Sequence, residues 1–172
     1  MDQLASYKSF AGALGALVFT AACALAQQAP PTTAQTLKQL FQGVNKQILD
    51  MAEDFPAEKY DFRLKPEMRS FGEVIVHVVG GNAFVAKAGR GEKAKWDELD
   101  AKNYKTKAEI VALLKKSIDD ANATLQANPE GYQHNIAPWL GVIEHSAEHY
   151  GLLVAYYRAN GMVPPESRPK SK

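Results

Sequence analysis

The chain has 172 residues, a formal net charge of +1 at pH 7, 46% hydrophobic residues and 23% charged residues. This balance is typical of a globular domain and excludes a chain that is disordered along its length. The near-neutral charge gives no electrostatic reason to expect binding to nucleic acid or to an anionic membrane surface.

The first 26 residues have the pattern of a bacterial secretory signal peptide. Lys8 precedes a short apolar run over residues 10–25, and an A-x-A cleavage pattern ends at Ala26. This pattern predicts a secreted or periplasmic protein that is cleaved after Ala26 and keeps no stable membrane span. Two alternatives stay open, namely retention of the segment as an N-terminal anchor and attachment of a lipid at Cys23.

Cys23 is the only cysteine of the chain, and cleavage would remove it. The mature protein would then have no disulfide, no thiolate nucleophile and no cysteine-ligated zinc site. Its stability must come from a hydrophobic core, to which a bound metal could add. We expect a linker over residues 27–32, one helical domain over 33–163 and a polar tail over 164–172.

The first half of the mature chain predicts two amphipathic helices. The first spans about 33–53 and ends before Pro56, because proline cannot continue the helical hydrogen-bond ladder. An apolar stripe runs along this helix with a spacing of three or four residues. The stripe consists of Leu37, Leu40, Phe41, Val44, Ile48 and Met51. Ser70 and Glu73 predict a capping box at the start of the second helix, which ends near Gly89.

Two further helices follow a long polar connection over residues 90–105. Thr106 and Glu109 predict the capping box of the third helix. For the fourth helix we expect Asn135 as the N-cap and Gly161 in the left-handed conformation after the last turn. Because strand-like alternation is absent from the sequence, we predict an all-α four-helix bundle. The long connection between helices two and three leaves the order of up and down helices open.

Three of the four histidines of the mature chain lie on apolar stripes of the predicted helices. His145 and His149 are four residues apart, so their side chains are stacked on one face, where two imidazoles can share a metal ion. His77 lies on the stripe of the second helix, and Gly81 one turn later leaves room beside its imidazole. Burying three imidazoles without partners would cost about a few kcal/mol in total. The pattern favours a metal site over a hydrogen-bonded network that only packs; His134, in a polar segment, is interpreted as a surface residue.

His145, Glu148 and His149 also match H-x-x-E-H, the motif of inverted zinc metalloproteases, in which Glu148 would be the general base. Such proteases need a downstream acidic ligand on another helix, and only Glu166 follows, in a proline-flanked segment. We therefore interpret Glu148 as exposed or as a residue that orients an imidazole. Paired Glu-x-x-His motifs for a di-iron site and C-x-x-C-H for haem are absent from the sequence.

Other polar and aromatic residues near the histidines do not identify a general base. Asn82 and Tyr150 are close to the histidines in sequence, which by itself assigns no role to them. Trp96 and Tyr104 lie in the connection between the second and third helices. We expect these two rings to pack against the bundle, with a shared wall of a pocket as the alternative.

Several stretches of the chain are similar to a known family. They are Tyr60-Asp61-Phe62-Arg63 with Pro66, Arg69 to Glu73 leading to His77, Glu144 to Gly151, and Tyr157 to Pro165. With them the chain resembles, over about residues 33–168, the DinB-like family of metal-binding four-helix bundles. In this family one histidine of the second helix and two of the fourth bind a divalent metal, which the resemblance implies for His77, His145 and His149. Members share an unusual helix order with a long connection between helices two and three, and many are dimers, which implies a homodimer.

The resemblance implies metal-dependent chemistry on a small molecule, since characterised members include thiol-dependent transferases and a mycothiol-dependent isomerase. A secreted member departs from these relatives, because the usual thiol cofactors are scarce outside the cytoplasm. We therefore expect a metal-dependent transferase or hydrolase acting on a small molecule, with a thiol as one candidate. The alternative is a non-catalytic periplasmic metal-binding or stress-related protein in which the metal is structural. Three imidazoles suit zinc, nickel or iron about equally well.

Overall fold

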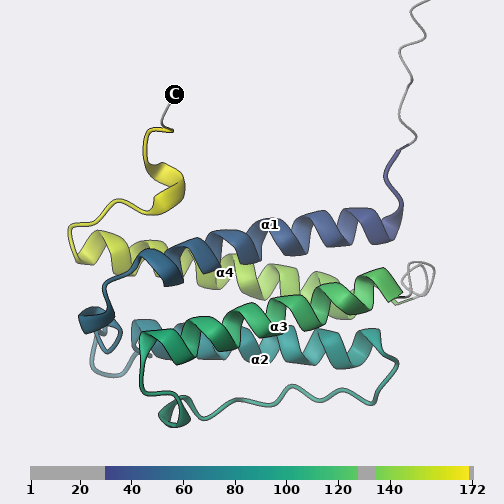
Figure 1. Cartoon of the computed structure of the whole chain (residues 1–172), viewed down its shortest axis with the longest axis horizontal. Coiled ribbons are helices and arrows are strands. Elements are labelled where there is room, and N and C mark those ends of the chain that lie inside the picture. Colours follow the sequence, from purple (N-terminus) through teal and green to yellow (C-terminus); the bar gives the residue numbers. More distant parts are fainter. Residues whose placement is uncertain (1–29, 128–134, 171–172) are drawn as a thin grey trace, which may run out of the picture. The chain divides into compact units, whose positions relative to one another are not determined.

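The computed structural model describes residues 30–127 and 135–170. Four long helices form this part of the chain, as Figure 1 shows: α1 (Thr33–Asp54), α2 (Phe71–Gly89), α3 (Lys107–Ala127) and α4 (Ala137–Ala159). Three single-turn 3₁₀ helices lie between or after them: η1 (Ala57–Lys59), η2 (Ala101–Asn103) and η4 (Pro165–Ser167). These described residues contain no strand, and the prediction of an all-α fold with four helices is confirmed.

The predicted signal peptide, its cleavage site, Cys23 and His134 lie outside the described residues. Within residues 30–127 and 135–170, none of the helices has the length and apolar character that crossing a membrane requires.

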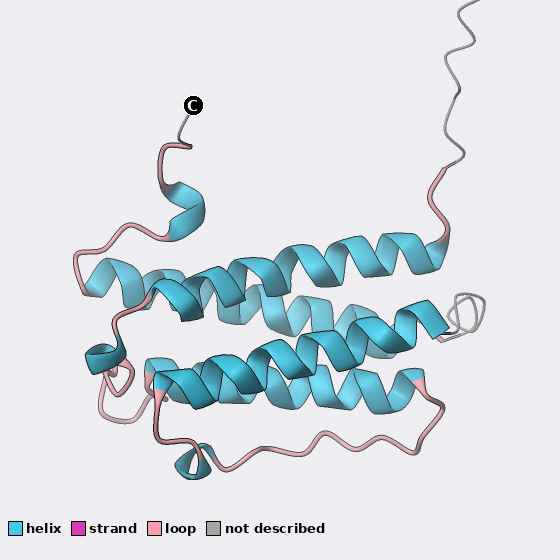
Figure 2. Ribbon diagram, in the orientation of Figure 1, coloured by secondary structure: helices cyan, strands magenta, loops and turns pink. Residues whose placement is uncertain are grey.

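The four helices have an up-down-down-up arrangement, in which α1 and α4 run in one direction and α2 and α3 in the other (Figures 1 and 2). Ring contacts agree, because Phe41 in the first half of α1 lies 5.4 Å from Trp139 at the start of α4. Likewise Gly72 at the start of α2 faces Ile110 at the start of α3. Two parallel helices cannot be joined by a tight turn, so residues 90–106 return along α2 before α3 begins (Figure 2).

Capping residues fix the starts of α2 and α3 as the sequence predicts. The Ser70 hydroxyl accepts from the backbone N–H of Glu73, and the Glu73 carboxylate accepts from the backbone N–H of Ser70. Thr106 and Glu109 exchange the same pair of bonds at α3. Each pair satisfies two backbone donors that the first helical turn leaves free. After α4, Gly161 adopts a φ of +69°, the left-handed conformation expected at that position.

Two local predictions are wrong. Asn135 is not the N-cap of α4, because the cap is Ile136, whose side chain makes no capping hydrogen bond; Pro138 in the first turn starts the helix instead. Leu40 is 49% exposed and does not belong to the buried stripe of α1. Since Leu37 and Phe41 define the buried face, a residue one position before Phe41 is turned about 100° away from it.

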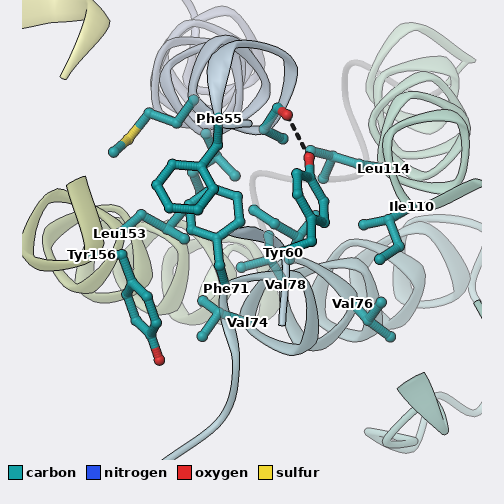
Figure 3. Close-up of a cluster of buried hydrophobic side chains, with 14 of the residues drawn as sticks. Phe55, Tyr60, Phe71, Val74, Val76, Val78, Ile110, Leu114, Leu153 and Tyr156 are labelled. Carbon is teal, nitrogen blue, oxygen red and sulfur yellow. Dashed lines mark hydrogen bonds between the residues drawn. The ribbon is translucent and has the colours of Figure 1, made fainter. Parts of the chain in front are cut away.

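Two hydrophobic clusters fill the two ends of the bundle. The aromatic cluster, at the end where α1 and α4 finish, is shown in Figure 3 and is built around Phe55, Tyr60, Phe71, Tyr156 and Tyr157. Its centre is the stacked pair of Phe55 and Phe71, whose ring centroids are 3.8 Å apart. The distal cluster, at the opposite end, includes Leu37, Phe41, Val85, Trp139 and Val142. Burial of these side chains supplies the main driving force for folding.

Between its residues of the two clusters, each helix has one buried polar side chain, and these four form a polar layer. This polar layer consists of Asn45, Asn82, Ser117 and Ser146. The Asn82 side-chain amide donates to Asn45 Oδ1 at 3.0 Å and to Ser117 Oγ at 3.1 Å. The side chain of Asn82 therefore forms hydrogen bonds in the interior of the bundle. The residues that precede Asn82 and Ser146 in sequence, Gly81 and His145, lie at the same level on the seam between α2 and α4.

Candidate metal centre

Helices α2 and α4 bring the three predicted histidines together into a histidine cluster of His77, His145 and His149. When one nitrogen is taken from each ring as a possible metal ligand, the three nitrogens all lie within 4.8 Å of one another. Nε2 of His145 is 2.9 Å from Nε2 of His77. His145 and His149 are stacked one turn apart on α4, with ring centroids 4.2 Å apart. The i, i+4 spacing thus places both rings on the face that meets α2.

One pair of these nitrogens is spaced as it would be on a shared metal ion. Two nitrogens bound to one ion at about 2.1 Å, with an angle of about 90–109° between the bonds, are about 3.0–3.4 Å apart. The Nε2 atoms of His77 and His145 lie just below that separation. Nδ1 of His145 is buried and has no hydrogen-bond partner within the described part of the chain. Within these residues the ring of His145 is held through its Nε2 contact with His77, and a shared ion would bind at that same nitrogen.

The outer nitrogens of the other two rings are held by acceptors. Nδ1 of His149 donates to the backbone carbonyl of His145 at 2.8 Å, and Nδ1 of His77 donates to the carboxylate of Glu98 at 2.9 and 3.0 Å. Because a carbonyl or carboxylate oxygen only accepts, Nδ1 of each ring carries a proton, and in the neutral form of the ring Nε2 then keeps its lone pair. This is the tautomer that a metal-binding imidazole needs when it binds through Nε2.

The electrostatic environment keeps two of the rings neutral. Burial, reinforced by the neighbouring His149 and His77, lowers the pKa of His145 to about 4. Burial also lowers the pKa of His149, although the hydrogen bond to the His145 carbonyl opposes the shift. Both imidazoles are therefore uncharged near neutral pH, and a metal ion need not compete with a second proton on either ring.

Trp96 from the connection covers the histidine cluster. Its ring centroid lies 4.7 Å from that of His145 in an edge-to-face arrangement. A Cβ atom on Gly81 would lie 2.8 Å from the Trp96 ring and 3.2 Å from Nδ1 of His145. The room that Gly81 leaves is thus taken up by Trp96 and His145. Tyr104 lies elsewhere and lines a separate pocket of about 520 Å³ at the starts of α2 and α3, so Trp96 and Tyr104 do not share a wall.

Sequence reasoning missed Glu98, whose carboxylate contacts both His77 and Arg69. Glu98 is 21 residues from His77 in a connection that holds several other carboxylates, and no spacing rule separates it from them. Glu148, for which a role beside the imidazoles was an alternative, is exposed on α4. The partner of a metal-site histidine therefore comes from the connection and not from the H-x-x-E-H segment.

The family of the chain follows from a comparison with sequence models of known families, in which residues 40–156 match the DinB superfamily. The chain belongs to the DinB superfamily. The matched range contains all three histidines and Glu98, and members of this superfamily often bind metal, which agrees with the histidine cluster. A search of curated proteins finds no match.

Proposed function

We propose that this member of the DinB superfamily is an exported, metal-dependent enzyme that acts on a small molecule as a transferase or hydrolase. The observation that carries the proposal is the convergence of three imidazoles from α2 and α4, with Nε2 of His77 and His149 left free of protons. Nδ1 of His145 is buried without a hydrogen-bond partner among the described residues, which would not be expected of a purely structural histidine.

The chemistry of the donors supports this assignment. A divalent zinc, nickel or iron ion held by the three imidazoles would lower the pKa of a water or thiol that reaches it, which makes either a nucleophile near neutral pH. Neutral imidazoles add no negative charge, so they leave the full charge of the ion available for that effect. Three protein ligands are also the number typical of catalytic sites, which keep one position open for substrate.

The class of small molecule is narrowed by the resemblance to thiol-using members of the family. Thiol transfer would need a thiol supply after export, and hydrolysis would need only water, so both reactions belong to the proposal. Arg69 lies beside Glu98 at the edge of the cluster, with its Nη2 atom 3.1 Å from a Glu98 oxygen. The nearby guanidinium offers a favourable contact for a thiol or ester that also carries a carboxylate.

The experiment is to replace the native metal with cobalt(II) and record its visible absorption during titration with a small thiol. The proposal predicts a shift of the cobalt bands as the thiol enters an open position, with loss of the bands in His145→Ala. The loaded protein is then assayed for conjugation of the thiol to an activated aromatic chloride and for hydrolysis of an activated ester.

One alternative has an observation in its favour. Because Trp96 packs on His145 and the ion would join α2 to α4, the metal could serve stability alone. If cobalt binds fully but its spectrum does not respond to thiol, the site is closed, and this result would contradict the proposal of an enzyme. A response without turnover of either probe would restrict the proposal to other substrates of the same open site.

A further inference from the structure

We propose that Glu98 is the positioning residue of the metal centre: it fixes the tautomer and orientation of His77, and Arg69 in turn fixes Glu98. This inference rests on the proposed function, since it assumes that the histidine cluster binds an ion. It assigns a role in the site to the connection between α2 and α3, which supplies none of the three ligands.

The geometry separates positioning from ligation. Both oxygens of Glu98 lie within hydrogen-bond distance of Nδ1 of His77, at 2.9 and 3.0 Å. The atom of His77 that meets His145 is Nε2, on the other side of the ring. The two ring nitrogens point in widely different directions. Glu98 therefore contacts the ring at the nitrogen that faces away from His145 and is not a further ligand of the same ion. The carboxylate accepts the Nδ1 proton and thereby leaves the Nε2 lone pair for the ion.

Arg69 holds the carboxylate from a second direction. Its Nη2 atom is 3.1 Å from the same Glu98 oxygen that contacts His77. Arg69 immediately precedes Ser70, the N-cap of α2, and its backbone carbonyl accepts a hydrogen bond from the hydroxyl of Tyr156 on α4. The guanidinium therefore extends from backbone that is tied to both helices of the site, which restricts where Glu98 can lie.

The backbone of the connection approaches α2 closely enough to deliver Glu98 because two glycines lie beneath it. A Cβ on Gly80 would be 3.1 Å from the carbonyl oxygen of Asp97, and one on Gly81 would be 2.8 Å from the ring of Trp96. Side chains at these positions would push the segment away from the helix. The connection thus contacts α2 through three consecutive residues. Trp96 and Asp97 pack against Gly81 and Gly80, and Glu98 contacts His77.

The expected consequence is a change in metal affinity. Loss of a carboxylate that orients a ligating histidine typically weakens metal binding about 10- to 100-fold. Glu98→Ala removes both the acceptor and its charge, and the dissociation constant for zinc should rise by about that factor. Glu98→Gln keeps an oxygen that can accept the Nδ1 proton, so its loss of affinity should be the smaller of the two.

The test measures zinc binding to the purified protein by competition with a coloured chelator, for the wild type, Glu98→Ala, Glu98→Gln and Asp97→Asn. Asp97→Asn is the matched control: it removes one negative charge from the adjacent residue, whose carboxylate is directed to Lys87 at 3.7 Å. Its zinc affinity should equal that of the wild type. Circular dichroism should show equal helix content in all four proteins, because the side chain of Glu98 is 52% exposed and lies in none of the helices.

A second readout separates a positioning role from a general effect. In protein labelled with ¹⁵N-histidine and loaded with zinc, the Nδ1 proton of His77 should be visible and slow to exchange in the wild type and in Glu98→Gln. In Glu98→Ala this signal should be lost. An unchanged signal and unchanged affinity in Glu98→Ala would overturn the inference, as would equal weakening by Asp97→Asn and Glu98→Gln. A wild type that binds no zinc would instead refute the proposed function.

Discussion

The aromatic cluster and the histidine cluster both include rings from α2 and α4, but they differ in how their polar atoms are satisfied. In the aromatic cluster the hydroxyl of Tyr60 donates to the carbonyl of Ala52, and that of Tyr157 donates to the carbonyl of Met51 at 2.8 Å. The hydroxyl of Tyr156 likewise has a backbone acceptor. Each ring can therefore be buried without an unpaired polar group.

The histidine cluster has the opposite character. Nε2 of His77 and Nε2 of His145 face each other at 2.9 Å, and Nδ1 of His145 has no partner among the residues that the structure describes. Such an arrangement contributes little to the stability of the metal-free protein, because it leaves a buried nitrogen of His145 without a partner among these residues. The first cluster is therefore complete as folded, whereas the second leaves ring nitrogens that could hold a metal ion.

The largest effect is expected when the aromatic cluster is broken. Phe71→Ala should lower the free energy of unfolding of the metal-free protein by about 3–5 kcal/mol, because it removes the ring stacked on Phe55 and leaves a cavity. Urea denaturation followed by circular dichroism measures this change. His149→Ala, which removes a ring from the other cluster, should cost no more than about 1 kcal/mol. Equal losses in the two variants would show that the histidines are ordinary core residues.

A substitution of Gly81, which lies beside His145 and Trp96, should have the next largest effect. Gly81→Ala places a methyl group 2.8 Å from the Trp96 ring and should destabilise the protein by about 1–3 kcal/mol while weakening zinc binding. Gly43→Ala is the control, because a Cβ there would meet no atom within 4 Å, and it should stabilise α1 by about 0.5–1 kcal/mol. Thermal melts and zinc titrations of both variants check this. A Gly81→Ala protein that behaves like Gly43→Ala would mean that Trp96 does not seat on α2.

A smaller effect should follow from removing one hydroxyl of the aromatic cluster. Tyr157→Phe deletes the hydrogen bonds to the Met51 carbonyl and to Asp54, and leaves a buried carbonyl without its side-chain donor. The expected loss is about 1 kcal/mol of unfolding free energy with zinc affinity unchanged. Urea denaturation and chelator competition on the same preparation test both parts. Weaker zinc binding in Tyr157→Phe would show that the two clusters are coupled.

The smallest effect concerns an ion pair next to the aromatic cluster. The hydrogen bonds from Arg168 hold the pKa of Asp54 below its ordinary value; burial opposes this shift and the Tyr157 hydroxyl adds to it. Since the folded pKa is depressed, the pair stabilises the protein above the unfolded pKa of about 3.9, and that stability is lost as pH falls through the folded value. The pair is partly exposed, so solvent screening should keep its contribution the smallest of the effects considered.

Arg168→Met provides the measurement for this ion pair. The difference in unfolding free energy between the wild type and Arg168→Met should be present at pH 7 and should shrink as the pH falls below about 4. A difference that grows on acidification would contradict the sign of the shift. The stability that the histidine cluster gains from zinc should be the same in both proteins.

Sequence could predict the parts of this molecule that depend on local spacing. The starts of two helices are predictable because a capping box lies within one turn: Ser70 with Glu73, and Thr106 with Glu109. His145 and His149 fall on one face because a helix repeats every 3.6 residues. The family resemblance and the periodicity pointed to the same three histidines, and the structure brings them together.

The remainder depends on contacts between segments far apart in the chain. Glu98 reaches His77 only because the connection returns along α2, and this path is set by Gly80 and Gly81 beneath Trp96. The parallel direction of α2 and α3 is likewise a property of packing, which the length of the connection permits but does not dictate. The exposed Leu40 shows that hydrophobicity alone does not assign a residue to the core.

The central claim, that the histidine cluster holds one divalent ion, is tested most directly by elemental analysis of the purified protein and of its His77→Ala and His145→Ala variants. We predict about one equivalent of zinc, nickel or iron in the wild type and none above background in either variant, with helix content unchanged in all three. A metal-free wild type that also fails to take up added zinc, while the variants fold normally, would contradict the account and leave three histidines that only pack.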